Sequence, residues 1–390
     1  MAEIKHIFIV CGEASGDLNA ANLAKAIFEK NPNAKISGVG GKLLKEAGVK
    51  IYYDIKDLSV IGLFDVLKKL PKFLFLKKLI LKKIKTDKPD AIILVDFSGF
   101  NLRLAKAIKK SIPVIYYISP QVWASRPGRI KTIKKYVDKM VVLFKFEKEF
   151  YKKYGIDADY TGHPLLDIAR PLMQKEEFIK EFHIYDPFES HPIIALLPGS
   201  REQEVKRILP LMLKASLLIK QTIDGAQFLI VKSTQVSWDT YHPITHAFQK
   251  DLKVIEGKTY DCLNVADFAI VCSGTATLET AIMQKPFVVI YKMSLLNYLL
   301  YLPQIRIPYI SLVNILAKKK VIPELIQFKA TPRNIYKQVI KLLTNPLEKE
   351  QLKKELAQIR SLLGDHGANQ RAAGIILDFL KTRPRQKQIS

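Results

Sequence analysis

The chain has 390 residues, 48% of them hydrophobic, which is long for one domain and sufficient for substantial cores. Its 62 Lys and Arg against 37 Asp and Glu give a formal net charge of +25, so it attracts polyanions such as nucleic acid, an anionic bilayer or phosphorylated substrates. Three scattered cysteines exclude a disulfide framework or a zinc site, and we expect buried thiols.

No signal-peptide pattern opens the sequence, and no run of about 18 uncharged apolar residues could form a spanning helix. We therefore expect a cytoplasmic protein.

Short runs rich in Ile and Val alternate with helical patterns along the chain. Strands are predicted over 6–11, 35–39, 50–54, 91–96, 114–118 and 139–143, with helices over 18–30, 102–109 and 146–154. A second series of strands is predicted over 193–197, 227–231, 253–255, 268–272 and 287–291. The strands are apolar almost throughout, which is typical of parallel sheets covered on both faces.

This alternation predicts an α/β fold of two doubly wound, Rossmann-like domains facing a cleft. We expect domains over 1–170 and 171–345, and a helical tail over 346–390. The tail either returns to the first domain or exchanges with a second copy, which would make a homodimer. Ligands of such sheets bind at the carboxyl ends of the strands.

The segment Val-Cys-Ser-Gly-Thr-Ala-Thr-Leu-Glu-Thr over 271–280 joins a predicted strand to a predicted helix. Gly274 lets the backbone approach a ligand, and the free N–H groups and dipole of the helix start favour a phosphate. Ser273, Thr275 and Thr277 add hydroxyl donors, and the carboxylate of Glu279 suits a ribose diol. The pattern indicates a nucleotide site; an ordinary turn capped by Ser273 is the alternative.

A second glycine loop, Leu-Pro-Gly-Ser-Arg-Glu over 197–202, follows the first strand of the second domain. Arg201 lies at a helix start, where the dipole disfavours a cation unless an anion is bound nearby. A bidentate arginine beside a diphosphate would resolve this conflict. The alternative is a surface arginine paired with Glu202 or Glu204.

Two loops of the first domain carry candidate bases. Asp96 ends an apolar strand at the rim of the sheet, where a partly desolvated carboxylate has a raised pKa and can deprotonate a hydroxyl; the alternative is a helix cap. Glu13, in the turn after the first strand, is the second candidate. In the same turn Ser15 or Asp17 is a standard N-cap.

A basic amphipathic stretch covers 63–85, and Pro71 is expected to divide it. Its apolar residues exceed one helix face, and with their neighbouring lysines they suit the surface of an anionic bilayer. A core-packing helix with a solvated lysine face is the alternative. The expected membrane-contacting residues are Phe64, Leu67, Lys68, Lys69, Lys72, Phe73, Phe75, Lys77 and Lys78.

Two further signals are weak. Asp157-Ala-Asp159 matches a metal-binding Asp-x-Asp pattern but does not lie at the carboxyl end of a strand, so we interpret it as chance. His163, in Thr-Gly-His-Pro at the domain junction, is either a ligand contact or a structural turn histidine. We expect no metal and no cofactor.

Seven motifs follow one another in a characteristic order: Gly-Glu-Ala-Ser-Gly-Asp (12–17), Gly-Gly-x-x-Leu-x-x-Ala-Gly (40–48), Leu-Ser-Val-Ile-Gly (58–62), Pro-Gln-Val-Trp-Ala (120–124), Gly-His-Pro (162–164), Leu-Pro-Gly-Ser-Arg (197–201) and Ser-Gly-Thr-Ala-Thr-Leu-Glu (273–279). Together they resemble the lipid-A-disaccharide synthase family. The order of the matches makes this resemblance more specific than any single motif.

The resemblance implies a GT-B fold and an inverting glycosyltransferase that needs no catalytic metal. Such enzymes join UDP-2,3-diacylglucosamine to 2,3-diacylglucosamine 1-phosphate, releasing UDP and forming a β-1,6-linked disaccharide at the cytoplasmic face of the inner membrane. The resemblance implies acceptor-side or catalytic roles for Glu13 and Asp96, and we expect Ser15, Asp17, Gln121 and His163 on the same side. Donor contacts are implied at Arg201, Ser273, Thr275, Glu279, Asn314 and Gln327.

The sequence departs from the family pattern at three places. Ser125 replaces an aromatic residue, Lys145 replaces a proline, and Lys318-Lys319 replace a Gly-Arg pair. The last change removes the arginine that could supply a guanidinium–phosphate contact from that loop.

Two other functions are alternatives. A UDP-N-acetylglucosamine 2-epimerase of the same fold would share the donor loop but would not need a lipid-binding stretch or a separate acceptor. A nucleic-acid-binding module would suit the positive charge, but RNA recognition usually uses an exposed sheet, whereas these strands are predicted to be covered. We therefore expect no nucleic-acid partner.

Overall fold

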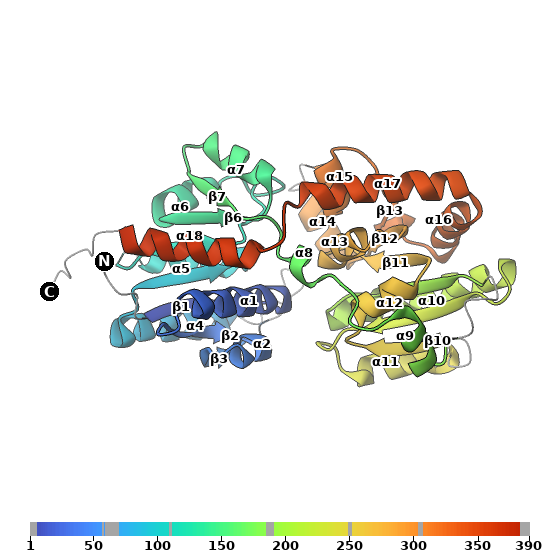
Figure 1. Cartoon of the computed structure of the whole chain (residues 1–390), viewed down its shortest axis with the longest axis horizontal. Coiled ribbons are helices and arrows are strands. Elements are labelled where there is room, and N and C mark those ends of the chain that lie inside the picture. Colours follow the sequence, from blue (N-terminus) through green and yellow to red (C-terminus); the bar gives the residue numbers. More distant parts are fainter. Residues whose placement is uncertain are drawn as a thin grey trace. The chain divides into compact units, whose positions relative to one another are not determined.

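The computed structural model describes residues 6–56, 58, 70–108, 111–184, 191–248, 252–302 and 307–382. They divide into two compact units. Unit 1 comprises Met1–Pro164 and Leu363–Ser390, and unit 2 comprises Leu165–Leu362. The unit boundaries therefore lie at 164 and 362, where the sequence predicted 170 and 345. In each unit, helices pack on a parallel sheet (Figure 1).

The described part of unit 1 contains a seven-stranded parallel sheet in the order β3-β2-β1-β4-β5-β6-β7. Its strands are β1 (His6–Val10), β2 (Lys35–Gly40), β3 (Lys50–Asp54), β4 (Ala91–Val95), β5 (Val114–Tyr117), β6 (Lys139–Val142) and β7 (Ala158–Tyr160). Its helices are α1 (Ala14–Lys30), α2 (Lys42–Glu46), α4 (Leu70–Asp87), α5 (Ser98–Ile108), α6 (Arg129–Tyr136), α7 (Lys145–Lys152) and α18 (Ala368–Thr382).

In unit 2 the described residues form a six-stranded parallel sheet in the order β10-β9-β8-β11-β12-β13. Its strands are β8 (Ile193–Leu197), β9 (Gln227–Lys232), β10 (Leu252–Glu256), β11 (Phe268–Cys272), β12 (Phe287–Tyr291) and β13 (Glu324–Ile326). Its helical segments are α8 (Leu165–Ile168), α9 (Lys175–Glu181), α10 (Glu202–Thr222), α11 (Trp238–Thr245), η1 (His246–Phe248), α12 (Thr259–Val265), α13 (Thr275–Ile282), α14 (Leu295–Tyr301), α15 (Leu312–Ala317), η3 (Gln327–Lys329), α16 (Pro332–Thr344) and α17 (Pro346–Leu362).

In each sheet, the strands follow the chain order outward in opposite directions from a central pair. In unit 1 β1 pairs with β4, with Val10 opposite Leu94. In unit 2 β8 pairs with β11, with Leu197 opposite Val271. Connections on either side of such a pair leave to opposite faces of the sheet, so a crevice opens at the carboxyl ends of the two strands. This topology places the loops of interest next to each other in each unit.

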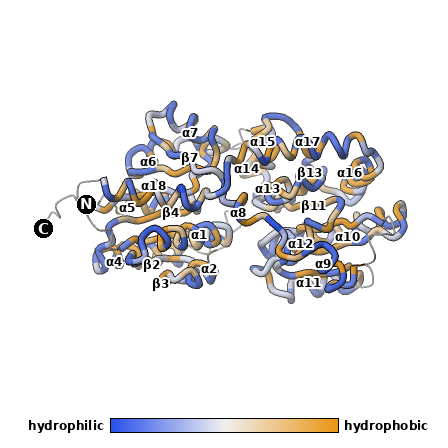
Figure 2. The backbone as a smooth tube through the Cα atoms, viewed as in Figure 1, coloured by the Kyte–Doolittle hydropathy of each residue, from blue (hydrophilic) through white to orange (hydrophobic). Residues whose placement is uncertain are grey.

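The predicted central strands are confirmed, and their burial explains their composition. All five residues of β4, β8 and β11 are buried, as parallel strands covered by helices on both faces must be. Figure 2 labels β4 and β11, which lie in hydrophobic stretches of the tube. The edge strand β13 was not predicted, because three residues carry no recognisable period and depend on pairing with β12.

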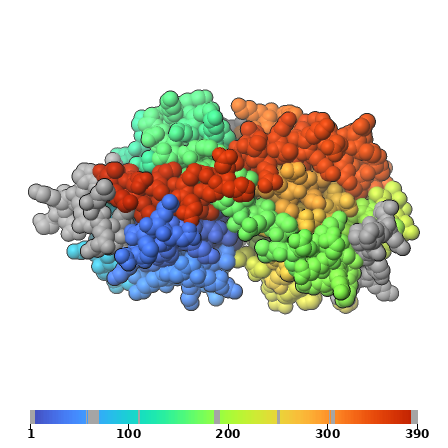
Figure 3. Space-filling view, viewed as in Figure 1, coloured from blue at the N-terminus to red at the C-terminus, as the bar shows by residue number. Residues whose placement is uncertain are grey.

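The last helix, α18, packs against α1 and completes unit 1, and its surface is visible in red in Figure 3. Gly162, which has a φ of +79°, packs close to the backbone of Leu363, just before this helix. The backbone N–H of His163 donates to the carbonyl of Leu363 at 2.9 Å, and Nε of Arg371 donates to the carbonyl of Thr161 at 2.8 Å. His163 is buried in this junction, with its ring 5.3 Å from that of Phe144.

Burial lowers the pKa of His163 to about 3, so the neutral imidazole is the form packed in the native state. The unfolded chain, with a pKa of about 6.5, binds more protons than the native state between these two values. The free energy of unfolding therefore falls as the pH drops from about 6.5 towards 3, and we expect this group alone to remove roughly 1.5–2 kcal/mol between pH 6.5 and 5.

Urea unfolding of the His163→Gln variant checks this expectation. Each unit contains one tryptophan, so Trp123 fluorescence in a Trp238→Phe background reports on unit 1. The variant should lose that part of the pH dependence; the same pH slope in parent and variant would contradict the assignment.

Candidate active site

In unit 2, the loop between β8 and α10 is closed by Glu204. Gly199 has a φ of +117°, and a Cβ there would lie 2.6 Å from Oε2 of Glu204. The backbone N–H of Ser200 donates to the same oxygen at 3.2 Å, and Nη1 of Arg201 donates to Oε1 at 2.9 Å. Arg201 is the N-cap residue of α10, and its guanidinium is partly exposed. The pairing of Arg201 with Glu204, given above as an alternative, is therefore the observed one.

The loop between β11 and α13 lies beside it. Gly274 is the N-cap of α13 with a φ of 148°, and a Cβ there would meet no atom within 4 Å. Ser273 is half-buried, while Gly274 and Thr275 are exposed at the start of the helix. Thr277 is buried and its hydroxyl donates to the carbonyl of Gly274 at 2.8 Å, so it stabilises the turn. The N–H of Thr277 donates to the Gly274 carbonyl at 3.1 Å, and the N–H groups at the start of such a helix favour an anion.

Glu279 lies one turn into α13. The hydroxyl of Tyr260 donates to its Oε1 at 2.8 Å. Burial raises the pKa of Glu279, and the Tyr260 hydrogen bond partly opposes that shift. A carboxylate held by a phenol at one oxygen keeps its second oxygen available as an acceptor.

Asn314 and Gln327 are both buried and bonded to nearby backbone. Nδ2 of Asn314 donates to the Ile322 carbonyl and to Glu324, and its Oδ1 accepts from the N–H groups of Val321 and Ile322. The amide of Gln327 exchanges two hydrogen bonds with the backbone of Met293. These contacts use the full hydrogen-bonding capacity of the Asn314 amide, so in this structure it organises the loop before β13.

In unit 1, the loop after β4 has an unusual backbone. Asp96 and Phe97 have φ values of 46° and 44°, in the left-handed region that costs non-glycine residues free energy. Three hydrogen bonds hold the loop at Asp96. Its carbonyl accepts from the Tyr116 hydroxyl at 2.5 Å and from Nδ2 of Asn101 at 2.9 Å, and its N–H donates to the Tyr117 carbonyl at 3.1 Å. The half-buried Asp96 side chain therefore projects from a loop with a defined conformation.

The neighbouring loop after β1 packs directly on this one. A Cβ at Gly12 would overlap the ring of Phe97, so only glycine fits there. Glu13 follows as the extended N-cap residue of α1, which starts at Ala14 rather than at the predicted residue 18. Ser15 is half-buried in the first turn. Glu13 and Asp96 thus belong to adjacent loops at the β1–β4 switch point.

Asp17 caps a different helix from the one on which it lies. It is buried, and its carboxylate accepts from the N–H groups of Gly41, Leu43 and Leu44 at 2.6, 3.0 and 3.3 Å. These groups belong to the start of α2. Burial raises the pKa of Asp17, while the three N–H donors oppose this shift. Asp17 therefore joins the loop after β1 to the loop after β2.

A buried glutamate that the sequence analysis missed organises the loop after β5. Oε1 of Glu147 accepts from the Ser119 hydroxyl at 2.7 Å and from the indole N–H of Trp123 at 3.1 Å. Gln121, in this loop, is exposed. Burial raises the pKa of Glu147, and its hydrogen bonds oppose that shift. Glu147 lies in the first turn of α7, which follows the apolar strand β6, and this position was the sequence signal that could have indicated its role.

Helix α4 has the buried stripe that the core-packing alternative requires, and it also carries exposed apolar residues. Leu76, Ile80 and Ile84 form a buried stripe at helical spacing, whereas Leu74 and Phe75 are 53% and 58% exposed. Phe73 packs on the loop of the candidate base, with ring centroids 6.0 Å from Phe97 and 6.1 Å from Phe100.

Lys72 and Lys78 are exposed on α4 and Lys77 is half-buried. Pro71 is the second residue of α4 as described, a position in the first turn where a proline is tolerated. The expected contacts Phe64, Leu67, Lys68 and Lys69 lie outside the described residues. None of the described helices is long and apolar enough to cross a bilayer.

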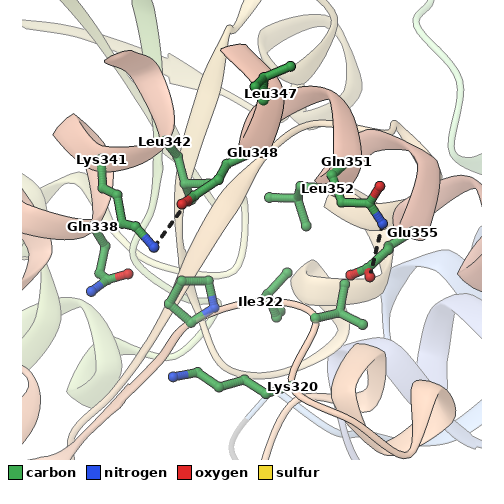
Figure 4. A pocket seen from close by; sticks show the side chains of 12 residues that line it. Lys320, Ile322, Gln338, Lys341, Leu342, Leu347, Glu348, Gln351, Leu352 and Glu355 are labelled. Carbon is green, nitrogen blue, oxygen red and sulfur yellow. Dashed lines mark hydrogen bonds and ion pairs between the residues drawn. The ribbon is translucent and has the colours of Figure 1, made fainter. Parts of the chain in front are cut away.

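Two pockets of unit 2 lie away from these loops. One, of about 430 Å³, is lined by residues of α16, α17 and the segment Lys320–Pro323 (Figure 4). Its carboxylates are engaged: Glu348 pairs with Lys341 at 3.1 Å and Glu355 with Lys319 at 2.7 Å. The other, of about 510 Å³, includes Pro192 and Asp267. Both contain residues that precede strands, so they lie at the amino edge of the sheet, opposite the ligand edge.

The charged pairs elsewhere do not suggest a metal centre. Asp159 and Asp157 both pair with Lys139. Among the described residues, no three His, Cys, Asp or Glu side chains are grouped to hold a metal ion.

Solved structures share the fold at low sequence identity. The co-structure of S. aureus MnaA with UDP has a TM-score of 0.65 at 13% identity and covers 98% of this chain and 99% of that one. A UDP-N-acetylglucosamine 2-epimerase from Listeria monocytogenes scores 0.61 at 14% identity and covers 100% of both chains. A glycosyltransferase from Rickettsia africae scores 0.56 at 15% identity, covering 98% of this chain and 100% of that one. These likenesses confirm the predicted fold class of two Rossmann-like domains and do not separate transferase from epimerase.

Sequence comparison makes that distinction. The family model described as lipid-A-disaccharide synthetase matches residues 7–376. A lipid-A-disaccharide synthase of Syntrophus aciditrophicus (strain SB) is 42% identical over 380 residues, covering 97% of this chain and 98% of the relative. One of Coxiella burnetii (strain CbuG_Q212) is 38% identical over 377 residues, covering 96% and 99%. The chain therefore belongs to the lipid-A-disaccharide synthase family of glycosyltransferases.

Proposed function

We propose that this hexosyltransferase condenses UDP-2,3-diacylglucosamine with 2,3-diacylglucosamine 1-phosphate. A hydroxyl of the acceptor attacks the anomeric carbon of the donor with inversion, the bond to the diphosphate breaks, and UDP leaves with the electron pair. The observation that carries this proposal is family membership along nearly the whole chain, with the motifs at 12–17, 197–201 and 273–279 following β1, β8 and β11 at the carboxyl edges of the sheets.

Turnover with radiolabelled donor and acceptor, with the product identified by mass spectrometry, tests the proposal. The disaccharide 1-phosphate is the expected product, and incubation with UDP-N-acetylglucosamine alone should give no epimer. An epimer in that control, or no disaccharide, would overturn it.

Donor binding is assigned to the β8–β11 switch point of unit 2. The exposed turn at Ser273–Thr275 and the start of α13 suit the diphosphate, because N–H groups and the helix dipole favour negative charge there. Arg201 supplies a guanidinium in the adjacent loop, and Glu279 supplies an acceptor for ribose hydroxyls. Asn314 and Gln327 support this site by holding neighbouring loops.

Acceptor activation is assigned to the β1–β4 switch point of unit 1, with Asp96 as base and Glu13 as second candidate. Proton removal by a positioned carboxylate contributes about two to four powers of ten in rate. Ser15, Asp17 and Gln121 complete the proposed acceptor side, with Asp17 acting through the loop it holds. His163 acts structurally, since it is buried as a neutral ring.

The proposed membrane contact is the segment containing α4, on an anionic inner-membrane surface facing the cytoplasm. Exposed Leu74 and Phe75 stand beside exposed lysines, and Phe73 contacts the loop that carries Asp96. A bilayer at this helix would therefore present acyl-bearing acceptors close to the proposed base.

Replacing Asp96 by Asn should lower kcat by roughly 10²- to 10⁴-fold, because the amide cannot accept the proton. UDP binding, measured by calorimetry, should be unchanged. Glu13→Gln is the matched variant: if it loses turnover while Asp96→Asn keeps it, the base assignment is reversed.

Replacing Arg201 by Ala should weaken UDP binding roughly tenfold or more, because a charge-assisted hydrogen bond to phosphate is lost. Lys206→Ala, which removes one positive charge from the same helix, is the control. Equal calorimetric Kd values for the two variants would argue against a direct phosphate contact.

Changing Lys68, Lys69, Lys72, Lys77 and Lys78 to Gln should reduce co-sedimentation with phosphatidylglycerol vesicles, by about 1 kcal/mol for each lysine near the surface. A control removes five exposed lysines of unit 2: Lys214, Lys337, Lys341, Lys353 and Lys354. Unchanged sedimentation of the first variant counts against this membrane contact.

A further inference from the structure

Helix α14 of unit 2 presents an exposed face made of leucines. Leu295, Leu296, Leu299 and Leu300 of α14 are 54%, 51%, 55% and 41% exposed, and the C-cap residue Leu302 is 48% exposed. At about 100° per residue, these positions cover an arc of about 160° on one side of the helix. Asn297, at a position outside this arc, is buried instead. Contiguous exposed apolar surface of this kind indicates an interaction site.

The apolar surface continues onto η3. Phe328 is 72% exposed, and its ring centroid lies 6.1 Å from that of Tyr298 on α14. The amide of Gln327 bonds the backbone of Met293, which joins η3 to the loop before α14. We call these five leucines and Phe328 the leucine surface. Because α14 follows β12, the leucine surface stands beyond the carboxyl edge of the sheet, the edge that carries Ser273–Thr275.

The charge around the leucine surface is positive. The sequence from Lys292 to Pro323 contains no Asp or Glu. Lys292 precedes α14, and Lys329 follows Phe328 on η3 and is exposed. The next carboxylate along the chain, Glu324, accepts hydrogen bonds from the N–H groups of Ile310 and Ser311 and from Asn314. An apolar face bordered by lysines complements an anionic lipid surface.

We propose that the leucine surface docks on an anionic bilayer, which gives unit 2 its own membrane contact in addition to the one assigned to α4. The inference rests on the proposed function, in which both substrates carry acyl chains. A protein partner fits less well, because protein interfaces carry about one hydrogen bond per 100–200 Å² and the exposed α14 leucines offer no side-chain donor or acceptor. The apolar interior of a bilayer requires no such hydrogen bonds.

Site-specific labelling tests the docking directly. The native cysteines Cys11, Cys262 and Cys272 are all buried, and burial raises the pKa of each thiol, so an introduced surface cysteine is labelled selectively. An environment-sensitive fluorophore is attached to Leu299→Cys and, as a control, to Leu172→Cys. Leu172 is 82% exposed in the same unit but outside the leucine surface.

With phosphatidylglycerol-containing vesicles, the label at 299 should shift to the blue and brighten about twofold or more, since a docked apolar face lies about 5–10 Å into the headgroup region. The label at 172 should not respond, and uncharged phosphatidylcholine vesicles should give a weaker response at 299.

Three results would overturn the proposal. The first is a silent label at 299 on protein that co-sediments with the vesicles. The second is a blue shift that grows with protein concentration without vesicles, which would indicate a second copy on the leucine surface. The third is equal responses at 299 and 172.

A second variant gives an independent measurement. Changing Leu295, Leu296, Leu299 and Leu300 to Gln should lower vesicle partitioning roughly tenfold, because binding scales with buried apolar area. Calorimetry with UDP should be unchanged in this variant. Absence of UDP heat in the parent protein would defeat the proposed function, whereas normal UDP heat with unchanged partitioning of the variant would defeat only the membrane contact of unit 2.

Discussion

The rest of the structure depends on one strand pairing in each unit, β1 with β4 and β8 with β11. At these pairs the crossover helices diverge to opposite faces of the sheet, and the carboxyl ends of the two strands open onto a crevice. Every residue of β4, β8 and β11 is buried, so the strands carry no chemistry themselves. The candidate catalytic and binding residues follow these strands, where the chain leaves the core and polar side chains meet solvent.

Those loops are held by buried carboxylates and amides rather than by apolar packing alone. Asp17, Glu147 and Glu204 each accept several hydrogen bonds in a loop at a sheet edge. Asn314 does the same before β13. A buried acceptor surrounded by N–H donors is costly to remove, because the donors then lose their partner without regaining water. Such residues give the candidate site a defined geometry.

Lysines and exposed apolar residues lie close together around α4 and α14. A formal charge of +25 alone suits nucleic acid as well as membranes. The strands that RNA-binding sheets would expose are buried here, whereas exposed leucines and phenylalanines lie beside lysines on α4 and next to α14. This combination is the basis of the proposed contacts with an anionic lipid surface.

The sequence by itself determined the two parallel sheets, their central strands and the loops that end them, because burial on both faces leaves an uninterrupted Ile and Val pattern that can be recognised locally. The order of its motifs determined the family. Only the tertiary structure decided which partners those residues have: Asp17 caps α2 instead of its own helix, Arg201 pairs with Glu204, and Glu147 reaches back to Ser119 and Trp123. It also decided that α17 belongs to unit 2 and α18 to unit 1. These contacts join residues far apart in the chain, or select one of several nearby partners, and a local pattern contains no information about such distances.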